Sequence, residues 1–319
     1  MSGTFLRGVL VVALAVSFGP GAFAASTLSV GKADANASPI LPVNVADKLG
    51  LFAKHGLDVK IADFTGGSKL TQAMTGGSID IGVGAGTEMA FVAKGAPMLA
   101  ICDDAPPIPF IGIGVPYDSP VHTVDQLKGR RIGISSPGSL TDWLAKELAR
   151  HEHWGPDGVT EVAIGNGAAG VMAAFRTNAV DADISVTSNI FNWEEKKQGR
   201  LLIPVSTYTG NIAAGTIYAT NALIASNPAA VRSFLAAWLE TIAYMRAHKD
   251  ETVKIESEVT GYSPAVMAKE YDLTIGMFSP DCKFDAQSIA NLKQSFADQK
   301  LVDPLPDMSK LYTEAFLPK

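Results

Sequence analysis

The feature that most constrains the fold is a regular alternation of short apolar runs with amphipathic stretches along residues 28–204. Runs such as 57–63 and 79–83 have the length and residue types of strands, whereas 68–75 and 139–150 have the spacing of helices. This alternation predicts an α/β fold. The chain contains no repeat of the length found in repeat proteins and no low-complexity linker.

A change in composition at residues 116–120 divides the alternation into two series, and a strand at 212–219 returns from the second series. We therefore predict two α/β lobes around a ligand cleft, joined by a two-stranded hinge. Lobe I is predicted to comprise residues 25–114 plus 219–319, and lobe II residues 115–218. The rest of the chain is predicted to be helical at 228–248, 251–259, 264–272 and 285–299, the first of these starting at Asn227 and Pro228, a typical helix start.

The N-terminus has the pattern of a secretory signal peptide. Arg7 precedes an apolar run over residues 8–18, Pro20 and Gly21 interrupt that run, and the small-x-small sequence 22–24 follows. We predict a signal peptide over residues 1–24 and a mature chain that begins near Ala25, free in the periplasm.

Charge and composition argue against several classes of function. The formal net charge is −6, without a cluster of Lys and Arg, so no nucleic-acid partner is expected. The five histidines lack the spacing of metal ligands, and neither a metal nor a cofactor is predicted. Cys102 and Cys282 are the two cysteines; an oxidising compartment permits their pairing, but the sequence leaves open whether they approach each other.

Two local motifs bear on catalysis. The sequence GNGAAG at 165–170 matches a dinucleotide-binding pattern, but nothing obvious at the required spacing binds the ribose, and we interpret the segment as a ligand-binding turn. No nucleophile elbow or comparable signature occurs. We therefore predict no catalytic residues and a protein that is not an enzyme.

Small polar residues stand at the turns that follow the predicted strands in both series. In open α/β sheets, ligands bind at the carboxyl ends of the strands, where helix N-termini present free N–H groups. The Gly-Ser pairs at 67–68 and 138–139 predict that helix N-termini hold an anionic part of the ligand. The predicted ligand-binding residues are Asn36, Ser38, Gly67, Ser68, Thr87, Glu88, Ser136, Ser139, Thr141, Asn166, Thr187 and Asn211.

Several segments in order along the chain resemble the nitrate/taurine/aliphatic-sulfonate (NitT/TauT-type) family of ABC-transporter binding proteins. They are LGLFAKHGLDV at 49–59, MTGGSIDIG at 74–82, KGAP at 94–97, TVDQLKGRRIGI at 123–134 and AAFRTNAVDA at 173–182. The resemblance implies the type II periplasmic binding protein fold and a monomer. It further implies capture of a small polar or anionic organic molecule, such as a sulfonate, taurine or nitrate, for an ABC permease of the inner membrane.

Two alternatives remain on the same fold: a receptor for a heteroaromatic compound, and a pyrimidine synthase of thiamine biosynthesis. That synthase family consumes its own histidine and needs iron, and its cysteine-rich C-C-C-F-C motif is absent here. Glu88 bears on the ligand chemistry. As a first-turn acid it complements a helix dipole, whereas as a cleft carboxylate it accepts from an amine or an aminopyrimidine N–H and repels a bare anion.

Overall fold

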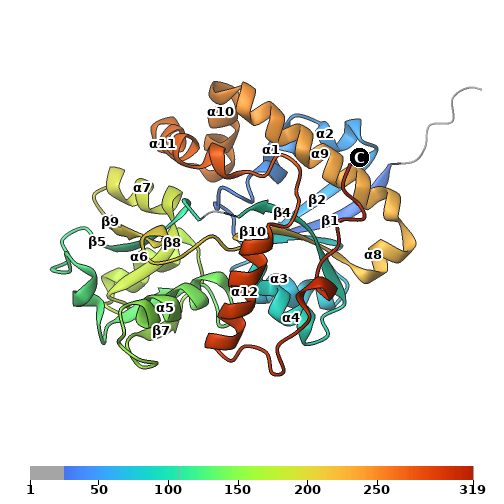
Figure 1. The fold of residues 1–319 in the computed structure, drawn as a ribbon. Coiled ribbons are helices and arrows are strands. Elements are labelled where there is room, and N and C mark those ends of the chain that lie inside the picture. The colour runs from blue at the N-terminus through green and yellow to red at the C-terminus, as the bar shows by residue number, and fades with distance from the viewer. Residues whose placement is uncertain (1–24, 107, 319) are drawn as a thin grey trace, which may run out of the picture.

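The computed structural model of the chain describes residues 25–106 and 108–318, and it contains two five-stranded sheets side by side (Figure 1). The predicted signal peptide lies outside these residues. The strands are β1 (Ser26–Lys32), β2 (Leu57–Asp63), β3 (Ile81–Gly84), β4 (Met98–Ala105), β5 (Ile111–Pro116), β6 (Arg131–Ile134), β7 (Thr160–Ala163), β8 (Ala182–Val186), β9 (Gly199–Pro204) and β10 (Gly215–Thr220).

Each sheet is parallel except for one strand. The first sheet has the order β2-β1-β3-β10-β4, and β10 runs antiparallel to both of its neighbours. The second has the order β7-β6-β8-β5-β9, and β5 is antiparallel to both of its neighbours. The reason is connectivity, because β5 and β10 are the strands that begin just after the chain has crossed from one sheet to the other.

Helices cover both faces of the first sheet (Figure 1), with α1, α2 and α9 on one side and α3 and α4 on the other. In the second, α5 packs on β6 and β8, and α7 on β5, β8 and β9. The strands β3, β8 and β10 are buried at every position, as expected for sheets covered on both faces. The helices are α1 (Pro42–Lys48), α2 (Leu51–Lys54), α3 (Gly67–Thr75), α4 (Met89–Ala93), α5 (Leu140–His151), α6 (Ala168–Arg176), α7 (Thr187–Glu195), α8 (Asn221–Ser226), α9 (Pro228–Ala247), α10 (Lys249–Thr260), α11 (Pro264–Thr274) and α12 (Ala286–Asp298).

The periodicity of residues 40–54 predicts a single helix, but the structure divides this segment into two. Gly50 separates α1 from α2 in the left-handed region, at φ 68°, a conformation that glycine adopts without strain. The short helix α8 was not predicted. The start of α9 agrees with the prediction, since the Asn227 side chain accepts from the backbone N–H of Ala230 and Pro228 is the first helical residue.

We refer to the first sheet with its helices as lobe I and to the second as lobe II. The chain crosses between them twice, in the segments between β4 and β5 and between β9 and β10. β5 belongs to the second sheet from Ile111 onward and β10 to the first from Gly215, so both crossings lie a few residues before the predicted lobe boundaries at 114/115 and 218/219. The division into residues 25–114 plus 219–319 and 115–218 stays a prediction.

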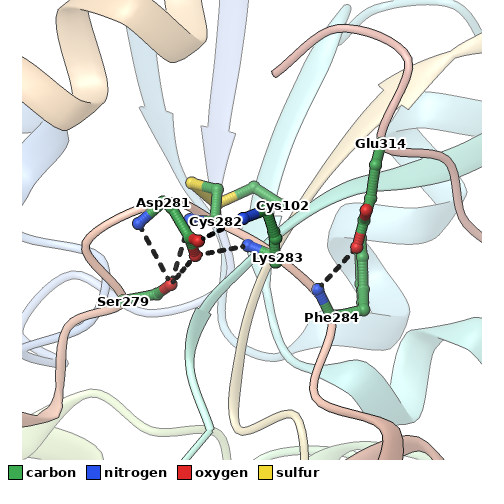
Figure 2. The surroundings of a disulfide bond; sticks show 7 residues. All are labelled: Cys102, Ser279, Asp281, Cys282, Lys283, Phe284 and Glu314. Atoms are coloured by element: carbon green, nitrogen blue, oxygen red, sulfur yellow. Dashed lines mark hydrogen bonds and ion pairs between the residues drawn. A yellow bond between two sulfur atoms is a disulfide. The ribbon is translucent and has the colours of Figure 1, made fainter. Parts of the chain in front are cut away.

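The C-terminal part of the chain returns to lobe I, where a disulfide joins Cys102 of β4 to Cys282 (Figure 2). Both cysteines are fully buried, and the Asp103 N–H donates to the Cys282 carbonyl at 3.1 Å. The Ser279 hydroxyl accepts the Cys282 N–H at 2.9 Å, which orders the turn that carries this cysteine. The pairing that the sequence left open is therefore present, and it closes a separation of 180 residues.

Membrane-spanning segments were sought over 25–106 and 108–318. None of the helices in these ranges combines the length and the apolar character that crossing a bilayer requires.

Removing the disulfide is expected to destabilise the protein without changing its fold. A cross-link over 180 residues strongly restricts the unfolded chain, so Cys102→Ser with Cys282→Ser should lower the free energy of unfolding by about 2–5 kcal/mol. Urea unfolding with and without a reductant measures this. The wild type should lose stability in reductant and the double variant should not; equal stability of all four samples would contradict the prediction.

Candidate ligand-binding site between the two lobes

A cavity of about 60 Å³ lies between the lobes, which limits its occupant to a small molecule in this closed arrangement. Its walls are the turns that follow β1, β2, β3, β6 and β7, with the end of β8 and the two crossing segments. It therefore lies at the carboxyl ends of the parallel strands of both sheets, the general position of ligands in open α/β folds. The polar lining residues are Asp34, Glu88, Ser135, Ser139, Thr141 and Asn166; the apolar ones include Pro39, Ile40, Phe110, Ile111, Leu140 and Val186.

Asp34 follows β1 and is held by three donors. Its Oδ1 accepts the backbone N–H groups of Asn36 at 2.7 Å and Ala37 at 3.0 Å, and its Oδ2 accepts from Nδ2 of Asn166 at 2.5 Å. Burial raises the pKa of Asp34, and the hydrogen bonds oppose that effect. Since Asn166 belongs to lobe II, Asp34 both lines the cavity and connects the lobes.

Glu88 follows β3 and is 2% exposed. Its Oε2 accepts the backbone N–H of Ala85 at 3.2 Å and the Thr87 hydroxyl at 3.0 Å. Burial raises the pKa of Glu88 to about 7. Gly67 lies against the same carboxyl group, because a Cβ there would be 1.7 Å from Glu88 Oε1. A larger residue at position 67 would thus compete with the carboxyl for space.

Three hydroxyls from lobe II form a cluster on the opposite wall. Ser135 Oγ lies 2.8 Å from Ser139 Oγ and 2.9 Å from Thr141 Oγ1, and Ser139 and Thr141 are 3.0 Å apart. Ser139 also accepts the Asp142 N–H at 3.4 Å and so caps α5. Hydroxyls both donate and accept, so this wall can complement either an acceptor or a donor on a ligand.

The two lobes also bond directly to each other around the cavity. Ser68 Oγ lies 2.6 Å from Ser136 Oγ, and Asn166 Nδ2 donates to the Ala33 carbonyl at 3.1 Å. Gly66, at φ 123°, lets these turns meet, since a Cβ there would lie 2.4 Å from Ser136 Oγ. The lobes are therefore closed on one another.

The predicted ligand-binding residues divide into three groups. Gly67, Glu88, Ser139, Thr141 and Asn166 line the cavity. A second group bonds to the other lobe or to the C-terminal helices instead: Asn36, Ser38, Ser68, Ser136 and Thr187. Thr87 is buried and bonded to Glu88, and Asn211 is exposed, with its carbonyl bonded to Asn291. A role in ligand binding stays a prediction for all twelve.

The site residues that were not predicted include Asp34, Gly66, Ser135 and the wall formed by Phe110 and Ile111. Ser135 stands in a turn that was chosen, whereas Asp34 lies two residues before the chosen turn at 36–38. The position of both residues just after a strand was a usable signal. Phe110 belongs to a crossing segment, and its sequence carries no signal of the cavity. Within 25–106 and 108–318, no group of three or more His, Cys, Asp or Glu residues could hold a metal ion.

Two lobes of mostly parallel sheet, connected by two crossings and closed over a cavity at their strand ends, define the periplasmic binding protein fold. The periplasmic aliphatic sulphonate binding protein of Escherichia coli has this fold and superposes with a TM-score of 0.73, at 20% identity over 90% of this chain and 92% of that one. The chain belongs to the family described as NMT1/THI5 like, whose model matches residues 38–252. The predicted fold is confirmed.

Relatives in sequence have names of two kinds. A 4-amino-5-hydroxymethyl-2-methylpyrimidine phosphate synthase of Candida albicans is 27% identical over 84% of this chain and 80% of its own length. A protein of Brucella abortus named as a binding protein is 24% identical over 67% of this chain and 66% of its own length. The prediction that the chain is not an enzyme is wrong, because its relatives include a protein named as a synthase.

The contact between Gly67 and Glu88 can be tested by substitution. Gly67→Ala should displace the Glu88 carboxyl from its two donors and lower the free energy of unfolding by about 1–3 kcal/mol. Gly167→Ala is the matched control, because a Cβ at Gly167 meets nothing within 4 Å. Chemical denaturation measures both variants.

A double variant decides whether Glu88 is the cause. Glu88→Ala removes the group that the new methyl meets, so the cost of Gly67→Ala should largely disappear in that background. An equal cost with and without Glu88 would show that the space around Gly67 is limited by something else.

Proposed function

We propose that the chain is a periplasmic solute-binding protein that captures a small amine-bearing heteroaromatic molecule of the aminopyrimidine type in the interlobe cavity. The observation that carries this proposal is the combination of two buried carboxyl groups, Asp34 and Glu88, with no Lys, Arg or His among the described lining residues. The carboxyl groups accept hydrogen bonds, and the amino group and protonated ring nitrogen of such a ligand donate them.

The same chemistry disfavours a bare anion. A sulfonate or nitrate would share the cavity with Asp34 and Glu88 without a cation among the described lining residues to balance the charge, and like charges at short distance in a buried site repel strongly. The apolar walls from Ile40, Phe110 and Val186 suit the faces of an aromatic ring. The name of the Candida relative, which contains an aminopyrimidine, supports the same ligand class.

Delivery to a membrane permease completes the proposal. The signal-peptide pattern over residues 1–24 supports export to the periplasm, and the fold is that of binding proteins which close around a ligand. We propose a monomer that binds its ligand with the lobes apart and presents the closed form to an ABC permease.

Chemistry on the bound ligand is a second candidate, favoured by the synthase among the relatives. Glu88, whose buried carboxyl has a pKa of about 7, is suited to take up or give a proton near neutral pH. Both candidates begin with the same binding step.

A binding screen tests the ligand class. The purified chain is titrated calorimetrically with 4-amino-5-hydroxymethyl-2-methylpyrimidine, taurine, ethanesulfonate and nitrate. We expect the aminopyrimidine alone to bind and to raise the melting temperature, since a ligand that binds only the folded state stabilises it. Binding of ethanesulfonate or nitrate in preference would contradict the proposal. Mass spectrometry of the recovered ligand separates capture, which returns it unchanged, from chemistry.

Substitution of Glu88 tests the carboxyl group itself. Glu88→Gln should weaken aminopyrimidine binding by about tenfold or more, because a charge-assisted hydrogen bond is replaced by a weaker one. Glu147→Gln is the control, since Glu147 is also buried but lies outside the cavity, bonded to Arg150. Equal affinity of the Glu88 variant and the wild type would return Glu88 to the role of a helix cap.

A further inference from the structure

A buried carboxyl group outside the cavity binds both lobes at once. Glu270 of α11 is 1% exposed. From lobe I, the Ser38 hydroxyl donates to its Oε1. From lobe II, Thr187 Oγ1 lies 2.7 Å from Oε2 and 3.0 Å from Oε1. Glu270 is not among the residues that line the cavity, so these bonds lie outside the ligand-binding site.

The turn between α10 and α11 adds a second bridge beside the first. The Tyr262 hydroxyl donates to Oδ1 of Asn189 in lobe II at 2.5 Å and accepts from Nδ2 of Asn36 in lobe I at 3.0 Å. Ser188 donates to the Asn36 carbonyl at 3.0 Å. The C-terminal helices thus contact the loop after β1 and the start of α7 together, at the place where the lobes meet.

Opening of the cleft must break this arrangement. Ser38 and Thr187 belong to lobes that move relative to one another when a two-lobed protein opens, so Glu270 can keep at most one of its two partners. The lost partner is a hydroxyl bonded to a buried acid, an interaction that strongly favours the arrangement in which it is made.

We propose that Glu270 is a latch that holds the two lobes closed from outside the ligand cavity, through its simultaneous hydrogen bonds to Ser38 and Thr187. The proposal concerns lobe closure alone and stands whichever ligand the cavity takes. Under this proposal the hydroxyls of Ser38 and Thr187 stabilise the closed arrangement of the lobes.

The surroundings make this latch sensitive to protons. Glu256 of α10 is also buried and lies near Glu270, while Lys269 of α11 pairs with Glu194 of α7 at 3.2 Å. The loop that carries Ser38 also carries Asp34. Burial raises the pKa of Glu270 to about 7, and the hydroxyl donors and Lys269 oppose that effect only in part.

The sign of the pH effect follows from linkage. Opening exposes Glu270 and returns its pKa toward the ordinary value of 4.5, so the closed form binds more protons than the open form. The contribution of Glu270 to closure is therefore complete below about pH 4.5. It decreases as the pH rises toward 7 and is constant above that.

Single-molecule energy transfer between the lobes tests the latch without any ligand. Dyes are attached to Lys60→Cys in β2 and Lys196→Cys after α7, two exposed positions on different lobes. The native cysteines are paired in the disulfide, so the dyes react with the introduced thiols and not with Cys102 or Cys282. We expect the closed fraction of the wild type to fall at least threefold from pH 5 to pH 8.

Variants separate the latch from general effects of pH. Glu270→Gln, which cannot ionise, should lose most of the pH response, the remainder coming from Asp34, which also bonds across the lobes. Glu270→Ala and Thr187→Val should lower the closed fraction at pH 5 at least threefold. Glu256→Gln is the matched control and should keep the pH response, because it leaves both hydroxyl bonds in place. Circular dichroism confirms that each variant is folded.

Two results would overturn the proposal: equal closed fractions of the wild type and Glu270→Ala at both pH values, or a Glu270→Gln variant that still responds to pH like the wild type. Failure of the aminopyrimidine to bind would leave this experiment unaffected, since no ligand is added.

Discussion

Burial of carboxyl groups that form no ion pair within the described residues is the constraint on which the interlobe region depends. Asp34, Glu88 and Glu270 are all at most 9% exposed, and each is held by hydroxyl or amide donors. Burying a carboxylate that forms no ion pair is costly, and burial raises the pKa of each of these groups. The region is therefore suited to a ligand that brings its own positive charge or donors, and unsuited to one that adds an anion.

The fold brings these acids together because of where parallel strands end. Asp34 follows β1 and Glu88 follows β3, and these two strands are neighbours in the first sheet. The carboxyl ends of both strands face the turns after β6 and β7 of the second sheet. Close approach is possible because the turns contain glycine at the points of contact. Gly66 meets Ser136 and Gly67 meets the Glu88 carboxyl, at distances that leave no room for a Cβ.

The sequence was sufficient to predict the helices and strands and the class of site, because both depend on local patterns. Periodicity located nearly all strands and helices, and the rule that ligands bind after parallel strands selected the turns that line the cavity. The sequence could not tell which turn residues face the ligand and which face the other lobe. Ser68 and Ser139 occupy equivalent Gly-Ser pairs, yet Ser68 bonds to Ser136 across the cleft whereas Ser139 lines the cavity. That difference depends on how the lobes meet, and no local pattern encodes it. The same holds for Cys102 and Cys282, which pair across 180 residues of chain.

The disulfide and the latch are two parts of one arrangement of the C-terminal region. Cys282 ties the segment after α11 to β4, and α10 packs on α1, so this region is fixed to lobe I at both of these points. Between them, α11 packs on α7 of lobe II and places Glu270 against Thr187. A helix anchored on one lobe and bonded to the other is strained by any relative movement of the two, whereas an acid within either lobe is not. Glu88, which is bonded only within its own turn, therefore responds to what fills the cavity, and Glu270 responds to whether the cavity is closed.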